Sequence, residues 1–149
     1  MKSGFKQGFF KPNNPQKYRG DPTNIVYRSG WEKKIMEWLD NRSDVVSWSS
    51  EEIIIPYYSP VDNRMHRYFP DFYVETLGSS GERRSFLLEV KPLNQTQEPK
   101  KQSRRTKRYI TEVVTYGINQ AKWKAAEEYC RNKGWEFKLI TEREIFSKK

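Results

Sequence analysis

The stretch "YFPDFYVETLGSSGERRSFLLEVKP", residues 68–92, decides the fold. It contains two runs rich in aromatic, β-branched and aliphatic residues, which predicts two strands. The segment "LGSSGE" between them predicts a flexible turn. Strand interiors disfavour aspartate, glutamate and lysine, yet the first run contains Asp71 and the second contains Glu89 and Lys91. Charges at such positions indicate a functional site rather than a core.

The alternation of side chains along a strand assigns these charges to faces. Glu89 and Lys91 share one face with Leu87 and lie about 7 Å apart. Because short connections favour neighbouring strands, Asp71 is expected to face Glu89 across the strand pair. The sequence therefore predicts two carboxylates and one ammonium group close together at strand ends.

Two carboxylates a few ångströms apart repel each other, so each needs a counter-charge. Mg²⁺ suits this pair, since it usually binds one or two carboxylates together with waters and phosphate oxygens. Such a cation polarises a phosphate and lowers the pKa of a bound water. The pattern predicts Asp71 and Glu89 as ligands of Mg²⁺, with Mn²⁺ as a possible substitute. Lys91 is expected to orient the water and to stabilise the charge that develops on the phosphate.

A first helix is predicted over residues 30–41. Ser29 and Glu32 form a capping-box pattern ahead of apolar residues at helical spacing. The Glu32 carboxylate can reach the strand-end site through a water or a second metal, and its capping role is compatible with this. Glu51 and Glu52 are further acids that compete for the role of metal ligand, but they precede a strand and are not expected to face the site.

The remaining elements follow from local periodicity and turn residues. Strands are predicted at 45–48, 52–58, 83–92 and 135–140, with a hairpin over 53–75, a long helix over 109–132 and a short helix from 141. The apolar positions of the long helix are expected to pack in the core: Ile110, Val113, Val114, Ile118, Ala121, Ala125 and Tyr129.

Two basic segments lie outside these elements. Residues 1–27 contain five Lys or Arg and one acid, Asp21, and are predicted to form an extended basic arm anchored through Phe5, Phe9 and Phe10. The second segment follows the strand of Glu89. Such a run is often only a solvated loop, but its position favours contact with nucleic-acid phosphates. Its basic residues are Lys100, Lys101, Arg104, Arg105, Lys107 and Arg108.

Composition narrows the classes of protein. A chain of 149 residues with 15% aromatic residues is expected to fold as one domain. Its net charge of +9 suits a polyanion, with nucleic acid first and an anionic membrane surface second. One cysteine, Cys130, and one histidine, His66, make a disulfide, a zinc site or a serine-type triad improbable. No apolar run suggests a membrane span or a secretory signal, so a reducing cytoplasm is expected.

The pattern Pro70-Asp71, followed by Glu89-x-Lys91, resembles the PD-(D/E)xK nuclease superfamily. This resemblance implies a restriction-endonuclease-like fold, with a mixed β-sheet flanked by helices in a single α/β domain. It also implies acids on adjacent strands and often a glutamate on the first helix, which here is Glu32. The domain is then expected over residues 28–149, after the basic arm.

Longer segments resemble the head completion nucleases of large contractile-tailed phages. These are "SGFKQGFFKPNNPQKYRGDPTNIVYRSGWE", "EEIIIPYYSPVDNRMHRYFPDF" and "LLEVKP". The resemblance implies a metal-dependent deoxyribonuclease that processes packaged double-stranded DNA before heads join tails. It implies the host cytoplasm, and the virion head or neck, as locations, and portal or neck proteins as partners. Carried over onto this sequence, the catalytic residues are Glu32, Asp71, Glu89 and Lys91.

Two other functions stay open at this point. One is a structural head or neck protein that binds DNA or portal through an inactive nuclease fold, although the intact set of acids and lysine argues against decay. The other is a junction or repair endonuclease of the same superfamily. The sequence leaves open endonuclease against exonuclease action and the oligomeric state.

Overall fold

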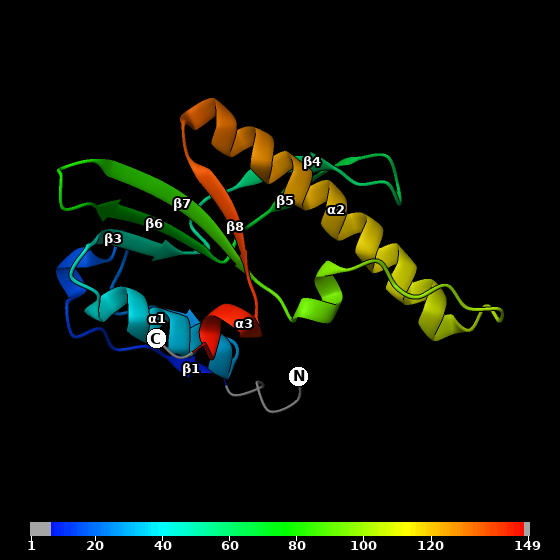
Figure 1. Ribbon diagram of the computed structural model, residues 1–149, viewed down its shortest axis with the longest axis horizontal. Helices are drawn as coiled ribbons and strands as arrows, with labels where there is room; N and C mark the ends of the chain where they lie inside the picture. The colour runs from blue at the N-terminus through cyan, green and yellow to red at the C-terminus, as the bar shows by residue number, and fades with distance from the viewer. Residues whose placement is uncertain (1–6, 148–149) are drawn as a thin grey trace.

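A four-stranded mixed sheet with helices on both faces forms the centre of the computed structural model, which describes residues 7–147 (Figure 1). The strand order is β3-β6-β7-β8, and only β7 and β8 run parallel. The long helix α2 joins these parallel strands, as a crossover connection must. A mixed α/β sheet flanked by helices was expected from the sequence, and this fold class is confirmed.

The elements have the following bounds in chain order. The strands and helices are β1 Gly8–Phe9, β2 Val26–Tyr27, α1 Gly30–Asn41, β3 Val45–Ser50, β4 Ile55–Tyr58, β5 Met65–Tyr68, β6 Phe72–Leu77, β7 Arg83–Val90, α2 Lys107–Lys133, β8 Glu136–Ile140 and α3 Glu142–Ile145, with short 3-10 turns at Pro15–Lys17 and Leu93–Thr96.

The two faces of the central sheet have separate cores. On one face, α1 and the N-terminal segment cover a cluster around the fully buried Trp48. On the other face, α2 and the β4–β5 hairpin cover a cluster that includes Trp123. Successive β7 residues alternate between these cores, with Leu87 in the second cluster and Leu88 in the first. The alternation predicted for this strand is therefore present.

The N-terminal segment packs against the body within the described residues. Phe10 and Tyr18 contact Trp48 edge to face, with ring centroids 5.9 and 4.8 Å away. Phe9 is 72% exposed, so its predicted role as an anchor is wrong, whereas that of Phe10 is confirmed. Phe9 ends β1 and Phe10 follows it directly, so these neighbouring side chains point to opposite sides. Phe5 lies outside the described residues.

The predicted hairpin over 53–75 is wrong in its second half. β5 pairs with β4, but the chain then leaves this pair, and β6 enters the central sheet between β3 and β7. The break falls at the buried Pro70, which has no N–H group to continue a ladder. Asp71 therefore lies at the start of a strand rather than in the middle of one.

The N-terminal part of α2 does not pack in the core. Its 27 residues make a helix about 40 Å long, whereas the adjacent five-residue β8 spans about 17 Å. The helix therefore projects beyond the sheet (Figure 1). Ile110, Val113 and Val114 are exposed, so their predicted burial is wrong. From Ile118 onward the stripe packs against the sheet as expected.

Candidate active site

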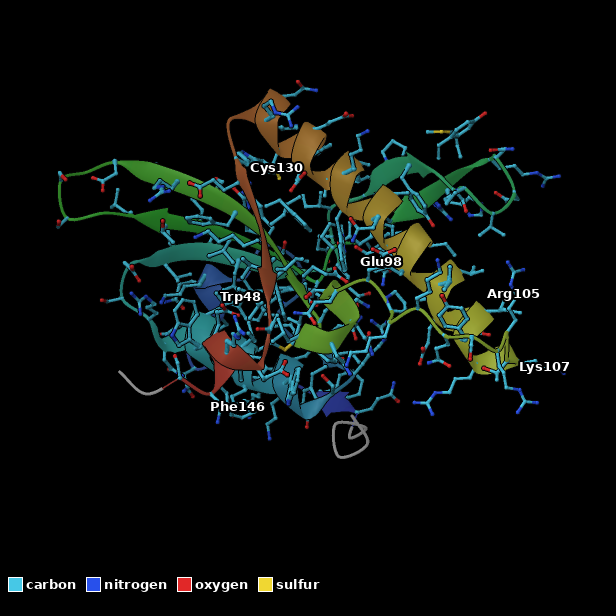
Figure 2. The ribbon with its side chains drawn as sticks, turned by 45° about the vertical axis from the view of Figure 1, so that its right-hand side comes forward. Trp48, Glu98, Arg105, Lys107, Cys130 and Phe146 are labelled. Atoms are coloured by element: carbon cyan, nitrogen blue, oxygen red, sulfur yellow. The ribbon has the colours of Figure 1, made fainter. Side chains whose placement is uncertain are left out.

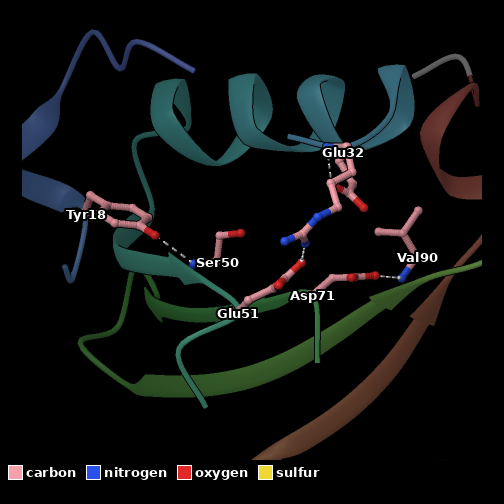
Figure 3. Close-up of polar contacts among 7 residues, drawn as sticks. Tyr18, Glu32, Ser50, Glu51, Asp71 and Val90 are labelled. Atoms are coloured by element: carbon pink, nitrogen blue, oxygen red, sulfur yellow. Dashed lines mark hydrogen bonds and ion pairs between the residues drawn. The ribbon is translucent and has the colours of Figure 1, made fainter. Parts of the chain in front are cut away.

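Asp71 and Glu89 face each other where β6 begins and β7 ends. The antiparallel register pairs Phe72 with Leu88, which places Asp71 opposite Glu89 one step further along. The Asp71 Oδ2 atom accepts a hydrogen bond of 2.8 Å from the Val90 N–H group (Figure 3). The backbone of β7 thus holds the Asp71 carboxylate beside the strand that carries Glu89.

Both oxygens of Glu89 have neighbours in the site. Its side chain is buried, and Oε1 accepts a hydrogen bond of 2.7 Å from the Tyr68 hydroxyl. Its Oε2 lies 3.8 Å from the Lys91 Nζ atom, at the outer limit of an ion pair. The ammonium of Lys122 on α2 lies 5.6 Å from the centre of the Tyr68 ring. Glu89 is therefore oriented by a hydroxyl and only loosely paired with a cation.

Burial makes this pair of acids hard to ionise. Burial, and then the charge of Glu89, raises the pKa of Asp71 well above its usual range, despite the Val90 N–H bond. Burial also raises the pKa of Glu89, although the Tyr68 hydroxyl, Lys91 and nearby Lys122 oppose this. Burial and mutual repulsion thus disfavour the ionised forms of the two acids, and an added cation would stabilise them.

Glu32 on α1 lies across from Asp71 (Figure 3). Half of the predicted capping box is present, since Ser29 Oγ accepts a hydrogen bond of 3.1 Å from the Glu32 N–H group. The Glu32 carboxylate instead accepts a 2.8 Å bond from the Arg28 N–H group. Burial, and to a lesser degree the charge of Glu51, raises the pKa of Glu32. Glu32 also acts electrostatically on Asp71, so α1 contributes a third acid to the site.

The donor set fits a divalent cation whose shell water completes. Within residues 7–147, no cluster of three or more His, Cys, Asp or Glu side chains is arranged to hold a metal ion by itself. Mg²⁺ requires fewer protein ligands, because it keeps several waters and binds one or two carboxylates. Asp71 and Glu89 supply two hard oxygen donors that face each other, so they are the residues that would hold it.

Glu51 lies in the site, so the expectation that it would not face the site is wrong (Figure 3). Its N–H group donates a 3.1 Å bond to the Asp71 carbonyl oxygen, and its carboxylate pairs with Arg28. Its φ of 56° is in the left-handed region, which costs a non-glycine residue about 1–2 kcal/mol. The turn at the end of β3 brings Glu51 back towards the acids, and sequence alternation cannot show this. Glu52, the other acid considered for the metal role, is exposed.

Two further site residues, Tyr68 and Arg28, were not predicted from the sequence. Tyr68 belongs to an aromatic run, where nothing distinguishes a core tyrosine from one that binds a carboxylate. Arg28 precedes the capping Ser29 and belongs to no motif. The Tyr68 hydroxyl and the Arg28 guanidinium reach the site through Glu89 and Glu51, both of which are distant in the chain.

The basic run lies apart from the acids. Figure 2 shows Arg105 and Lys107 at the projecting end of α2, with Glu98 closer to the body. All six basic side chains of residues 100–108 are exposed. Thr106 caps the helix there, accepting a 3.1 Å bond from the Tyr109 N–H group. The structure thus brings Glu32, Asp71, Glu89 and Lys91 together and separates them from the basic run.

Two comparisons with known proteins bear on this site. Residues 42–142 match the family described as "TnsA-like endonuclease N terminal", a span that includes Asp71, Glu89 and Lys91 but not Glu32. The chain is also similar to the head completion nuclease of Enterobacteria phage T4. The two are 40% identical over 139 residues, which cover 91% of this chain and 90% of the relative.

Proposed function

Since the chain belongs to the TnsA-like endonuclease family, and is therefore a nuclease, we propose that it hydrolyses phosphodiester bonds of double-stranded DNA with the help of Mg²⁺. The resemblance predicted from the sequence motifs is confirmed by this membership. The proposed biological setting is head completion in a tailed phage, before heads join tails. That setting is supported by the name and near-complete coverage of the phage relative.

The observation that carries the proposal is the facing pair Asp71 and Glu89 with Lys91 beside it. A structural protein has no need for two buried acids whose pKa values are raised. Such strain is expected where a cation and a substrate phosphate neutralise the acids during function. This observation favours an active enzyme over a DNA- or portal-binding protein with an inactive fold.

The chain's own residues have distinct proposed roles. Asp71 and Glu89 would hold the cation, which when bound polarises the scissile phosphate and acidifies a water. Tyr68 fixes the orientation of the Glu89 carboxylate through its hydroxyl. Lys91 places an ammonium beside Glu89, where it can orient the attacking water and stabilise charge on the phosphate oxygens. Glu32 offers a further acceptor for an ordered water on the α1 side.

DNA binding is proposed to use charge outside the catalytic centre. The projecting end of α2 can contact phosphates some distance along the duplex while the acids act on one bond. The division into a basic segment 1–27 and a nuclease domain over 28–149 is part of this proposal, although Phe10 and Tyr18 of the segment pack in the domain's core. No helix within residues 7–147 is both long and apolar enough to cross a bilayer. Assembly in the host cytoplasm, with portal or neck proteins as partners, is part of the same proposal.

The decisive experiment is incubation of the purified protein with linear and with closed circular duplex DNA, each with Mg²⁺ and with EDTA. Cleavage is expected only with Mg²⁺, and Mn²⁺ should substitute for it. Cutting of the closed circle would establish endonuclease action, whereas degradation of the linear form alone would establish exonuclease action. Binding of DNA without any cleavage would instead support the inactive, structural alternative.

Neutralising the basic run should weaken DNA binding without sequence preference. We expect two to four of its six charges to contact phosphate. The slope of log affinity against log salt should therefore become shallower by about 2–4 units, at about 0.9 per contact. Saturating DNA should restore much of the cleavage rate, because the acids are untouched. Titrations of labelled duplex at several salt concentrations measure the slope. The variant replaces Lys100, Lys101, Arg104, Arg105, Lys107 and Arg108 by Gln.

A matched control changes basic residues at the opposite end of α2, about 40 Å away. The double variant Arg131→Gln with Lys133→Gln removes two charges and should leave the slope of log affinity against log salt nearly unchanged. An unchanged slope in the six-fold variant would show that the run is only a solvated surface. The DNA would then have to be bound by residues 1–27 or by the body of the helix.

Tyr68→Phe is expected to lower cleavage at limiting Mg²⁺ by about 10–100-fold, the usual cost of losing a partner of a metal ligand. The hydroxyl is lost from a buried carboxylate that accepts its hydrogen bond at 2.7 Å. Raising the Mg²⁺ concentration should recover part of the rate. Tyr73→Phe is the control, because this buried tyrosine donates to or accepts from Ser85 rather than Glu89. Equal losses in both variants would contradict a positioning role for Tyr68.

A further inference from the structure

Arg28 contacts two acids of the site, one through its side chain and the other through its backbone. This residue joins β2 to α1, and its Nη1 atom forms an ion pair with Glu51 Oε2. Its backbone N–H group donates a 2.8 Å bond to Glu32 Oε1. The guanidinium also lowers the pKa of Glu32 through its charge. A guanidinium, which binds phosphate strongly, is thus held by Glu51 and lies close enough to Glu32 to act on its charge.

The backbone of Glu51 is strained in the position that receives this guanidinium. A φ of 56° is uncommon for a residue with a side chain, and such strain gathers at functional sites. The Glu51 N–H group is bound to the carbonyl oxygen of Asp71. The strained turn therefore fixes the backbone of Glu51 beside Asp71, the acid that would bind the cation, and Glu51 holds the Arg28 guanidinium from this position.

The ion pair between Arg28 and Glu51 is exposed enough for Arg28 to exchange one anionic partner for another. The Arg28 side chain is 55% exposed and that of Glu51 is 31% exposed, so water reaches both partners. Exposed ion pairs contribute little to stability and are readily replaced. A guanidinium binds phosphate through two parallel hydrogen bonds, a geometry that matches an incoming DNA strand as well as it matches a carboxylate.

We propose that Arg28 is a phosphate-binding residue of the active site, and that Glu51 holds its guanidinium beside the acids until the DNA phosphate replaces the Glu51 carboxylate. The inference rests on the proposed function as a DNA nuclease. In the free protein Arg28 offsets part of the acidic charge that would repel DNA. In the complex it adds a second cationic group, besides Lys91, next to the substrate strand.

The first test is Arg28→Ala in single-turnover cleavage at saturating duplex DNA with Mg²⁺. The rate is expected to fall about 10²-fold or more, the usual effect of losing a hydrogen-bond donor that stabilises the charge developing in the transition state. Arg28→Lys should recover only part of it, because lysine lacks the planar fork. The matched control is Arg83→Ala, since Arg83 is 58% exposed and paired with Glu75 at the far end of β7. It should cut at the wild-type rate.

The second test separates release of Arg28 from a general change of charge. In EDTA, Glu51→Gln should bind labelled duplex about two- to fivefold more tightly than Glu52→Gln, which removes the same charge one residue away. The gain should vanish when Glu51→Gln is combined with Arg28→Ala, because no guanidinium is left to release. Thermal unfolding of each variant verifies that the fold is retained.

The outcomes are distinguishable. A gain that persists in the double variant would be a plain charge effect and would refute the proposal. A loss of cleavage in Glu51→Gln that added Mg²⁺ restores would make Glu51 a metal ligand and refute it as well. Normal cleavage by Arg28→Ala would refute this inference alone. A wild-type protein that neither binds nor cuts DNA would refute the proposed function, and this inference with it.

Discussion

Replacing Asp71 by Asn is expected to reduce Mg²⁺-dependent cleavage to below about 1% of the wild-type rate. This loss is larger than the roughly 10–100-fold loss typical when a residue that only hydrogen-bonds to a metal ligand is removed. The same result is expected for Glu89→Gln. Both changes keep the size of the side chain, and the amide oxygen that Asp71→Asn introduces can still accept the Val90 N–H bond, so the fold should persist. What each change removes is a charged oxygen ligand of the cation. Gel-based cleavage of linear DNA over a range of Mg²⁺ concentrations measures the loss.

The control for this prediction is Asp44→Asn. It removes a carboxylate that pairs with Arg42 on the surface, at 2.7 Å. This variant should cut DNA at the wild-type rate. Near-normal cleavage by either Asp71→Asn or Glu89→Gln, at any Mg²⁺ concentration, would mean that the assignment of the metal site is wrong.

Asp71→Asn should lose activity but gain folding stability when no metal is bound. The folded pKa of Asp71 is raised, so the native state binds the proton more tightly than the unfolded chain. The wild type therefore loses stability as pH rises from the unfolded value of about 3.9 through the folded pKa. In EDTA at pH 8, Asp71→Asn should be the more stable protein, and the difference should disappear towards pH 4. Urea unfolding at several pH values tests this, and a gap independent of pH would contradict it.

Lys91→Ala is expected to slow cleavage by about 10²-fold or more at saturating DNA, if its ammonium stabilises charge in the transition state. Its effect on DNA affinity should be small, because it removes one charge from a protein with 28 Lys and Arg. The loss should therefore appear in the single-turnover rate rather than in the DNA concentration at half-saturation. Stopped-flow cleavage with excess enzyme separates the two quantities.

Lys138→Ala is the control for Lys91→Ala. Lys138 lies on the neighbouring strand β8, with its ammonium 5.2 Å from the centre of the Phe86 ring, so its charge lies over an aromatic ring rather than beside the acids. Its loss should leave the cleavage rate unchanged. If Lys91→Ala instead lost its DNA affinity and cut at the normal rate when saturated, Lys91 would be only a phosphate anchor.

The sequence by itself determined the features that depend on neighbouring residues. The first helix was predicted over 30–41 and is found at Gly30–Asn41, because its cap and apolar spacing are local signals. The facing of Asp71 and Glu89 followed from a short connection and strand alternation, and the register bears it out. The α/β fold class and the family followed from the order of these elements and the longer resemblance, and both are confirmed.

Only the tertiary structure decided which surfaces are covered and which distant side chains meet. The stripe at Ile110, Val113 and Val114 has core spacing, but the sheet ends before it and leaves it exposed. The chain crosses between sheets at Pro70, a step that periodicity on either side cannot show. The contacts of Arg28 with Glu51 and of Tyr68 with Glu89 join residues about 20 positions apart. Local propensity acts over one or two turns of chain, whereas burial and ion pairing depend on what the rest of the fold places alongside.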